Sequence, residues 1–598
     1  MLQAAAVAVV AALVLWRYFE TPRTLTRWHT KGQFAAISAT DRYDVLVVGG
    51  TPSGIAAALA AGRRGARVLL VDLHPNLGGD VVYAMLNQFD VPIRPGQATP
   101  VHGIFAEFFD QLGVAFSIDE AQRLFESTVQ ANPNIEVMTR TRAVQALKNE
   151  SKVVGAVLKS APDPTLGAAF GEATTPKEKQ REVLATVVVD ATNDADFAAR
   201  AGAGYYVGRE IANRDKKMQS AGLLFSVSGV NWEQVKDYVR DKRRMRRSDI
   251  HQHLKKSTIK TLPIQSTPQK SASITPASWT VSTAFQASVQ SPFEYSMRGA
   301  KAFRLAALPD MDHPRGPRID TRKSGQSLPL AWLRLGGAHG NYAWERGDIV
   351  KAYKPHGADI LCLSINFGRQ NDGSVVLNTI NILNVNGLDA KSMQHARREA
   401  MQELPFFMAH LRRAMPGFAH AKLKQVAPEL YIRETRHIHG FYSIKAEDVR
   451  AQNRFYDRVA LASYPLDLHP YTKGQINPYS PRRYYYALPL RSLVPRAVDG
   501  VFVASRSLSA TYSAAGSCRV IPITMAAGEA AGAAAWLCAT KGVSPHQILG
   551  NDPTYLRQLQ SNLREGGADI GDDIPQLVLQ SAILRAKHRV FQRRTALH

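Results

Sequence analysis

A strand, a glycine turn, a helix and a second strand follow one another in residues 44–72, DVLVVGGTPSGIAAALAAGRRGARVLLVD. Apolar runs predict strands at Asp44–Val48 and Arg67–Val71, and an alanine-rich segment predicts a helix at Ser53–Arg63. The turn needs glycine, and the free N–H groups at the helix start favour an anion. With Asp72 closing the second strand, the pattern predicts an α/β fold that binds a dinucleotide.

The turn departs from the usual G-x-G-x-x-G pattern at one position. It runs from Gly49 to Gly54, with Thr51 in place of the second glycine. A β-branched side chain restricts the approach of backbone to phosphate, although its hydroxyl could donate a hydrogen bond. Pro52 suits a first helical turn, where its missing N–H is not needed. An acid at Asp72 would accept hydrogen bonds from ribose hydroxyls, which favours FAD or NAD over NADP.

Length and cysteine content exclude several classes. At 598 residues the chain exceeds the roughly 250–300 residues at which one core stops growing, so at least two domains are expected. Its three cysteines, Cys362, Cys518 and Cys538, are far apart and lack metal-ligand spacing. Neither a disulfide framework nor a metal site is predicted.

The net charge of +24 has two main sources, a basic run at 236–260 and a basic C-terminal tail. The run has no interleaved aromatic residues and the chain has no recognisable nucleic-acid module, so nucleic acid is not an expected partner. Anionic lipid is the better candidate because residues 2–16, LQAAAVAVVAALVLW, are uncharged. Basic residues follow this segment, which favours an uncleaved anchor with a cytoplasmic catalytic domain. A cleaved signal and an exported enzyme remain the alternative.

Two later blocks also place small residues at strand ends. In residues 185–203 an apolar strand leads through Asp190-Ala191-Thr192 into a turn and another helix. In residues 499–539 a strand, a polar loop and a small-residue helix starting near Ile521-Pro522 follow one another. Arg506 and Arg519 flank the loop, which suits the edge of a flavin where negative charge accumulates on reduction.

Taken in order, these motifs resemble the FAD-dependent oxidoreductase family, related to fumarate-reductase-type flavoproteins and to the glutathione-reductase-like flavin fold. The matching pieces are VVGGTPSG with Asp72, the Gly78-Gly79 doublet, VVDATNDAD, RETRHIHGFYSIKAEDV, SYPLDLH, and ALPLRSLVP leading into 499–539. The resemblance covers about 44–205 and 390–570. It departs from the family at Asn193 and Ser505, where related proteins often have glycine.

The resemblance implies FAD as cofactor and a role for each matching position. The candidates for cofactor binding are Gly49, Gly50, Thr51, Pro52, Ser53 and Gly54 at the pyrophosphate, Asp72 and Leu73 at the ribose, Gly78 and Gly79 at the flavin-side phosphate, Val144 at adenine, and Thr192, Asn193, Ser505, Arg506, Arg519 and Pro522 around the flavin.

The fold class implied is α/β, with a Rossmann-like FAD-binding domain on a parallel sheet, a mixed α+β cap or substrate domain, and an N-terminal hydrophobic helix. The predicted divisions are 1–19 anchor or signal, 20–42 linker, 43–210 first FAD-binding part, 211–430 cap with a basic disordered insertion at about 240–325, 431–550 substrate-side strands and second FAD-binding part, and 551–598 C-terminal helices and basic tail.

The substrate side is less defined. Arg433, Arg436, His437 and His439 form a basic cluster, and Asp467 and His469 lie in SYPLDLH. The cluster favours an anion or proton-relay site equally with a structural ion-pair network around Arg433 and Glu434. The candidates for catalysis are Arg519, Arg506, Arg436, His437 and His469.

Three functions fit this sequence. The first is a flavoenzyme that moves hydride between a small-molecule substrate and flavin N5. The second is a membrane-bound electron-transfer subunit with a redox partner protein, and the third is a basic scaffold with a vestigial flavin fold. A yellow purified protein would exclude the third.

Overall fold

The computed structural model describes residues 41–91, 102–161, 180–213, 215–241, 331–334, 342–345, 347–475 and 484–574. The chain divides into residues 1–41 and 42–598, and the elements described here belong to the second unit. The predicted N-terminal helix, the linker up to residue 40, nearly all of the basic insertion and the basic tail lie outside the described residues.

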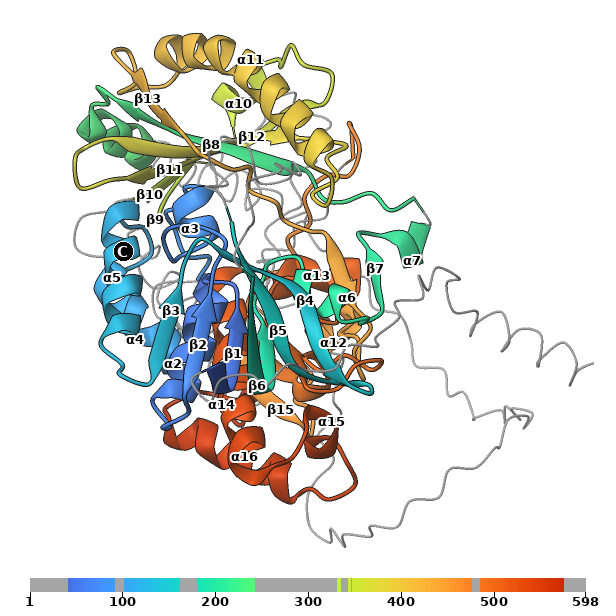
Figure 1. The fold of residues 1–598 in the computed structure, drawn as a ribbon. Helices are drawn as coiled ribbons and strands as arrows, with labels where there is room; N and C mark the ends of the chain where they lie inside the picture. Colours follow the sequence, from blue (N-terminus) through green and yellow to red (C-terminus); the bar gives the residue numbers. More distant parts are fainter. Residues whose placement is uncertain are drawn as a thin grey trace, which may run out of the picture. The chain divides into compact units, whose positions relative to one another are not determined.

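A seven-stranded sheet forms the nucleotide-binding half, with strand β1 at its centre (Figure 1). β1 pairs in parallel with β2 and β6, β2 pairs in parallel with β3, and β6 pairs in parallel with β17. β5 pairs antiparallel with both β6 and β4 and extends the sheet at that end. The strands are β1 (Arg42–Val48), β2 (Val68–Val71), β3 (Ile135–Met138), β4 (Thr141–Asn149), β5 (Lys152–Ser160), β6 (Gln180–Asp190) and β17 (Val501–Val503).

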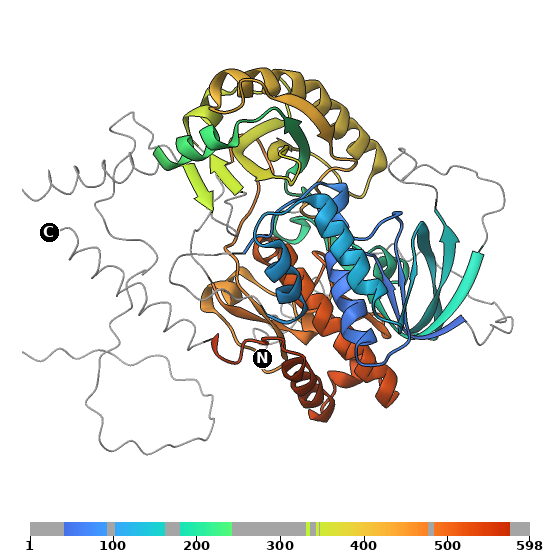
Figure 2. The same cartoon turned by 90° about the vertical axis from the view of Figure 1, so that its left-hand side faces the viewer.

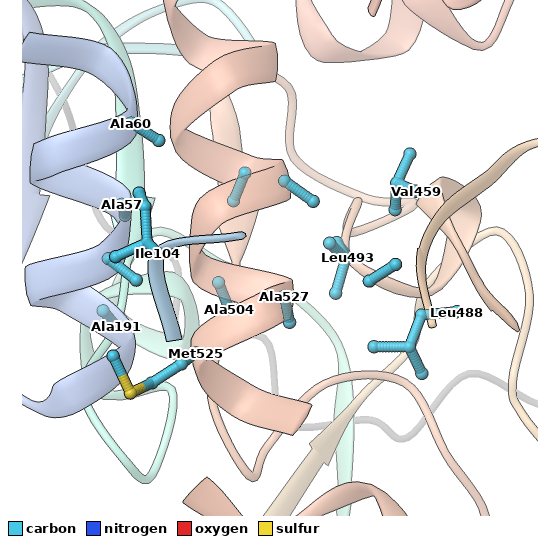
Figure 3. Packing of buried hydrophobic residues seen from close by; sticks show 14 of the residues in the cluster. Ala57, Ala60, Ile104, Ala191, Val459, Leu488, Leu493, Ala504, Met525 and Ala527 are labelled. Carbon is cyan, nitrogen blue, oxygen red and sulfur yellow. The ribbon is translucent and has the colours of Figure 1, made fainter. Parts of the chain in front are cut away.

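Two helices made of small residues pack directly against each other beside this sheet. They are α2 (Pro52–Gly62) and α14 (Ile521–Lys541), seen side by side in Figures 2 and 3. A Cβ added at Gly528 would lie 2.1 Å from the Ser53 carbonyl oxygen, and one at Gly532 would lie 2.1 Å from the Ala57 carbonyl oxygen. The alanine and glycine content of both segments therefore reflects a contact at backbone distance.

α14 is also the one helix in the described ranges that is long and apolar enough to cross a membrane. Of its most apolar window, 78% is buried. Met525 lies on the side of α14 that faces α2, and Ala527 lies on the opposite side, toward Leu488 and Leu493 (Figure 3). α14 is therefore a core helix of this fold.

Shorter elements complete the nucleotide half. They are α3 (Asp80–Tyr83), α4 (Gly103–Leu112), α5 (Ile118–Gln130), α6 (Asp196–Arg200), α7 (Glu210–Asn213), α12 (Ala446–Ala451), the 3₁₀ turn η3 (Leu490–Ser492), α13 (Tyr512–Cys518), α15 (Pro545–Ile548), α16 (Thr554–Glu565), and the two strand pairs β7 (Tyr205–Val207) with β14 (Arg436–Ile438) and β15 (Arg458–Ala462) with β16 (Tyr486–Pro489).

The cap half is an antiparallel sheet in the order β13-β8-β12-β11-β10-β9, with a core of its own against α11. Its elements are β8 (Ala221–Ser228), a helix at 232–241, β9 (Ala331–Arg334), β10 (Tyr342–Glu345), α10 (Asp348–Ala352), β11 (Ile360–Arg369), β12 (Val375–Ile382), α11 (Ala390–Ala414) and β13 (Lys422–Val426). Phe225, Phe367 and Phe407 lie in this core. The predicted mixed α+β character of this segment agrees with the structure.

Candidate active site

The glycine turn between β1 and α2 leaves no room for side chains. Gly49 has φ +108°, and a Cβ there would lie 2.7 Å from backbone atoms of Ala191 and Thr192. A Cβ on Gly54 would lie 1.8 Å from the Gly49 carbonyl oxygen. The two glycines therefore let α2 begin directly against the end of β6.

Thr51 replaces a glycine here because it caps the helix. Its hydroxyl oxygen accepts a hydrogen bond from Gly54 N–H at 3.2 Å and donates to the Ala191 carbonyl oxygen at 2.9 Å. The hydroxyl suggested by the sequence as a phosphate donor is thus engaged within the protein. Pro52 has no N–H and the Gly54 N–H is bonded to Thr51, so what the first turn of α2 offers an anion is the Ser53 N–H and the positive end of the helix dipole.

Asp72, at the end of β2, is buried and held by three donors. Its carboxylate accepts hydrogen bonds from Gly50 N–H and from His74 N–H at 2.7 Å, and the His74 ring Nδ1 lies 3.0 Å away. The other ring nitrogen of His74 lies 2.8 Å from Glu429, in the segment after β13. Burial alone would lower the pKa of His74, but Asp72 and Glu429 raise it to about 10. His74 is therefore a cation that joins the nucleotide half to the cap half.

Arg506 connects three loops around the turn. Its guanidinium donates to Asp194 at 2.8 Å and to Asp80 at 3.1 Å. Ser507 adds a hydrogen bond to the Asn193 carbonyl oxygen, and Ser505 is fully buried. Thr192 accepts from Asp196 N–H and donates to the buried Asp190. These side chains hold the loops in place. The guanidinium of Arg506 already has two carboxylate partners, Asp80 and Asp194.

A narrow hollow lies between the glycine turn and the start of α14. Its walls are Thr51, Pro52, Ser53, Asp80, Asn193, Tyr431, Ile432, Arg433, Arg506, Arg519, Ile521 and Thr524. Gly78 and Gly79 both have positive φ beside it, and a Cβ on Gly79 would lie 3.1 Å from the Thr51 side chain. Pro522 faces a different hollow, next to Glu529 and His102, so α14 presents Ile521 and Thr524 to the turn instead.

A second cavity of about 450 Å³ adjoins this hollow on the cap side. The two spaces share three wall residues, Tyr431, Arg433 and Arg519. The remaining wall comes from five segments of the sequence: Leu86, Gln88 and Asp90; Tyr342; Leu361, Leu363, Ser364 and Asn366; Asn378 and Asn381; and Tyr464, Asp467, Leu468, His469, Pro470, Gly474 and Gln475. Its volume lies within the range of small-molecule sites.

Two buried arginines stand in the shared wall. Arg519, the C-terminal cap of α13, donates to the Tyr431 hydroxyl at 3.0 Å and pairs with Asp467 at 3.2 Å. Arg433 donates to the Ser220 carbonyl oxygen at 2.6 Å and lies over the Tyr431 ring. Burial and the nearby Arg519 charge lower the pKa of Arg433 to about 10, so both remain cations at neutral pH.

His469 faces the same cavity as a neutral base. Its ring Nε2 lies 3.5 Å from Asp467, and the backbone N–H of His469 donates to Gln219 Oε1 at 3.0 Å. Burial and the Arg433 charge lower the pKa of His469 to about 4. Burial would raise the pKa of Asp467, but His469 and the two arginines lower it, so the carboxylate is ionised. Nδ1 of His469 is buried without a hydrogen-bond partner in the described part of the chain.

Other predicted site residues lie elsewhere. Arg436 pairs with Asp196 at 2.8 Å, and His437 is buried against Glu434 at 2.9 Å, both outside the cavity wall. Val144 lies at an irregularity in the β4–β5 pairing, three residues after Thr141, whose N–H donates to the Asp72 carbonyl oxygen at 2.8 Å. Leu73 is half-buried beside Asp72. The roles assigned to these residues stay predictions.

A family model described as FAD dependent oxidoreductase matches residues 44–563, most of the chain. The chain belongs to the FAD-dependent oxidoreductase family. It is an enzyme of that family, and FAD is its cofactor. No curated protein matches this FAD-dependent oxidoreductase significantly.

The solved structures that match this chain do so with low identity and low TM-scores. A geranylgeranyl bacteriochlorophyll reductase-like protein from Thermoplasma acidophilum is 11% identical with a TM-score of 0.36, covering 91% of this chain and 88% of that one. A p-nitrophenol 4-monooxygenase from Pseudomonas putida is 9% identical with a TM-score of 0.36, over 91% and 97%. A myxobacterial chondrochloren halogenase is 11% identical with a TM-score of 0.36, over 88% and 80%. We draw nothing about the substrate of this oxidoreductase from them.

The residues at the turn fit the cofactor of this family. The glycine cradle would be filled by any Cβ at Gly49 or Gly54, and a dinucleotide phosphate suits the helix start that follows it. Tyr431, Asn378 and Asn381 in the cavity wall had not been expected from the sequence. One signal for Tyr431 was available: it stands two residues before Arg433, so an extended segment places both on one side.

Proposed function

We propose that this oxidoreductase transfers hydride between a small-molecule substrate held in the 450 Å³ cavity and the flavin of FAD. The observation that carries the proposal is the shared wall. Tyr431, Arg433 and Arg519 border both the hollow beside the glycine turn and the larger cavity. A substrate in the cavity and a cofactor anchored at the glycine turn would therefore both lie next to these three residues, and so close to each other.

When bound, FAD supplies a hydride acceptor at flavin N5. Oxidising an alcohol also requires a proton to leave the hydroxyl oxygen as the hydride leaves carbon. His469 is suited to take that proton, because it is neutral and Nδ1 has no partner in the described residues. Asp467, on the Nε2 side, favours the tautomer that leaves Nδ1 free to accept.

Arg519 would contribute charge rather than proton transfer. It is buried, its pKa is raised by Tyr431 and Asp467 despite the opposing effect of burial, and it stands at the boundary between the two spaces. A fixed cation there would stabilise negative charge that develops during reduction.

The test is anaerobic bleaching of the flavin in the full-length holoenzyme with a panel of reductants that includes NADH and small alcohols. The proposal expects a reductant whose rate of bleaching falls in His469→Gln while flavin content is unchanged. Bleaching by a small alcohol at the same rate in wild type and variant would contradict the role of His469.

The membrane electron-transfer alternative has no observation in its favour within the described residues. Their one helix of sufficient length and apolarity, α14, packs in the core. We therefore propose no second function.

A further inference from the structure

The cavity wall carries charge and hydrogen-bonding groups that the hydride-transfer proposal leaves unexplained. Arg433 is 2% exposed, and its Nε has no hydrogen-bond partner among the described residues. Arg519 has Asp467 as its ion-pair partner, but no carboxylate forms an ion pair with Arg433 in that part of the chain. Asp467 and Asp90 line the same cavity and act to raise the pKa of Arg433 from a distance. A ligand carboxylate would give Arg433 the directly contacting anion that it lacks among the described residues.

The cap sheet contributes a polar face to the same cavity. Asn366 and Asn378 are directly opposite each other on β11 and β12, and Ser364 and Asn381 line the cavity beside them. The other side of these strands carries Ile365, Phe367 and Leu377 into the cap core. Because side chains alternate along a strand, the side of these strands that faces the cavity carries carboxamides. A sheet that bound a purely apolar ligand would carry more hydrocarbon there.

Asn381 has hydrogen-bonding capacity to spare. Asn381 is 4% exposed, its Nδ2 donates to the Thr379 carbonyl oxygen at 3.0 Å, and its Oδ1 has no partner in the described residues. A buried acceptor of this kind is satisfied by a hydroxyl donor from a ligand.

We propose that the substrate is a small polyhydroxylated carboxylate, of the sugar-acid class, whose carboxylate binds Arg433 and whose hydroxyls bind the amides of β11 and β12. The inference rests on the proposed function, because it assigns the substrate class of the same cavity. An arginine fork matches a carboxylate in geometry as well as charge. Several hydroxyls along the ligand would meet the donors and acceptors of the cap sheet.

The experiment is calorimetric titration of the oxidised, full-length holoenzyme with matched probes. D-Gluconate carries both groups, D-glucitol carries only the hydroxyls, acetate carries only the carboxylate, and further sugar acids with their polyols cover other stereochemistries. Acids are expected to bind at least about tenfold more tightly than their neutral partners. Equal affinity within every pair would overturn the proposal.

Variants separate the two contributions. Arg433→Gln should weaken the acids about 10- to 100-fold and leave the neutral polyols unchanged, whereas Arg433→Lys, which keeps the charge, should retain a preference for acids. Asn381→Leu should weaken gluconate and leave acetate unchanged. Arg397→Gln is the matched control, because Arg397 also donates to a backbone carbonyl, at 2.6 Å, but lies outside the cavity.

Other outcomes identify which proposal fails. If Arg433→Gln shifts the flavin midpoint potential without ligand and leaves acid affinity unchanged, Arg433 serves the flavin and the carboxylate assignment is wrong. If the acids bind as expected but neither they nor any other reductant bleaches the flavin, the substrate-binding inference stands and the hydride-transfer proposal fails.

Discussion

The two sides of the candidate site are built from different parts of the chain. At the glycine turn, Gly49, Gly54 and Gly528 bring backbone against backbone, and any added Cβ would lie within 2.7 Å of a neighbouring backbone atom. In the cavity the walls are side chains, among them Arg433 and His469. The glycine turn suits a phosphate group at a helix start, which every dinucleotide carries. In the cavity, by contrast, substitution of a single side chain can change which substrate binds.

The largest expected effect tests the backbone side. Gly54→Val would place a side chain 1.8 Å from the Gly49 carbonyl oxygen, so α2 could not begin where it does. We expect complete loss of bound FAD, measured by the flavin spectrum of the purified protein. Gly373→Asn is the control, because a Cβ at that turn meets nothing within 4 Å. A stoichiometric flavin spectrum in Gly54→Val would contradict the assignment of the turn.

The next effect tests the side-chain side. His469→Gln should slow flavin reduction by about 10²–10⁴-fold while FAD content is retained, because a positioned base is lost. Arg433, Arg519 and Asp467 all face His469, and burial with the Arg433 charge lowers its pKa to about 4. The wild-type rate should therefore be flat above pH 5 and fall as the pH approaches 4. A rate that instead falls as the pH drops through about 6.5 would show an ordinary, exposed histidine.

This contrast also explains what could be predicted from the sequence. The turn and Asp72 occupy one contiguous stretch whose spacing defines its geometry, so strands, helix and acid follow from local pattern. The cavity is assembled from residues as distant in the sequence as Gln88 and Arg519, with Asn381 and Arg433 between them. The local sequence pattern predicts which face of a strand carries each side chain, but it does not predict which other segments pack against that face.

Arg433 and Arg436 illustrate the point within one short segment. Both are arginines of one basic cluster, yet Arg433 borders the cavity while Arg436 pairs with Asp196. The difference arises because β14 begins at Arg436 and pairs with β7, which gives that residue a neighbour no local pattern reveals.

A smaller effect is expected at Asp72, the predicted partner of the ribose. Asp72→Ala should weaken FAD by roughly 1–3 kcal/mol, the scale of an unpaired charged hydrogen-bond site. Because the carboxylate also accepts from Gly50 N–H and His74 N–H, some thermal stability should be lost with it. FAD affinity and Tm are both measured. Unchanged affinity with a collapsed Tm would show that Asp72 serves only the fold.

The link between the halves gives a pH-dependent prediction. The pKa of His74 is raised to about 10, so its contribution to stability is fully present below its ordinary pKa of 6.5 and is lost as pH rises through 10. His74→Gln should lower stability by about 1–2 kcal/mol at pH 6, and the difference from wild type should shrink by pH 10. Denaturant unfolding at several pH values measures this. A constant difference would mean that His74 acts by packing on Tyr83 alone.

The smallest expected effect concerns Cys518, the cysteine next to Arg519 in the motif at 499–539. It is buried, its sulfur lies 3.4 Å from the Tyr486 hydroxyl, and burial raises the pKa of the thiol to about 12. A thiol that stays protonated is a poor nucleophile, so thiol-based redox chemistry is not expected.

Cys518→Ser keeps the shape and offers Tyr486 a hydroxyl, so turnover should be unchanged and stability should shift by no more than about 0.5–1 kcal/mol. The rate of flavin reduction by the same substrate, compared between Cys518→Ser and Arg519→Met, decides between thiol-based chemistry at Cys518 and charge stabilisation by Arg519. Loss of reduction in the serine variant, with reduction retained in Arg519→Met, would mean that chemistry passes through the thiol and that the buried cation is dispensable.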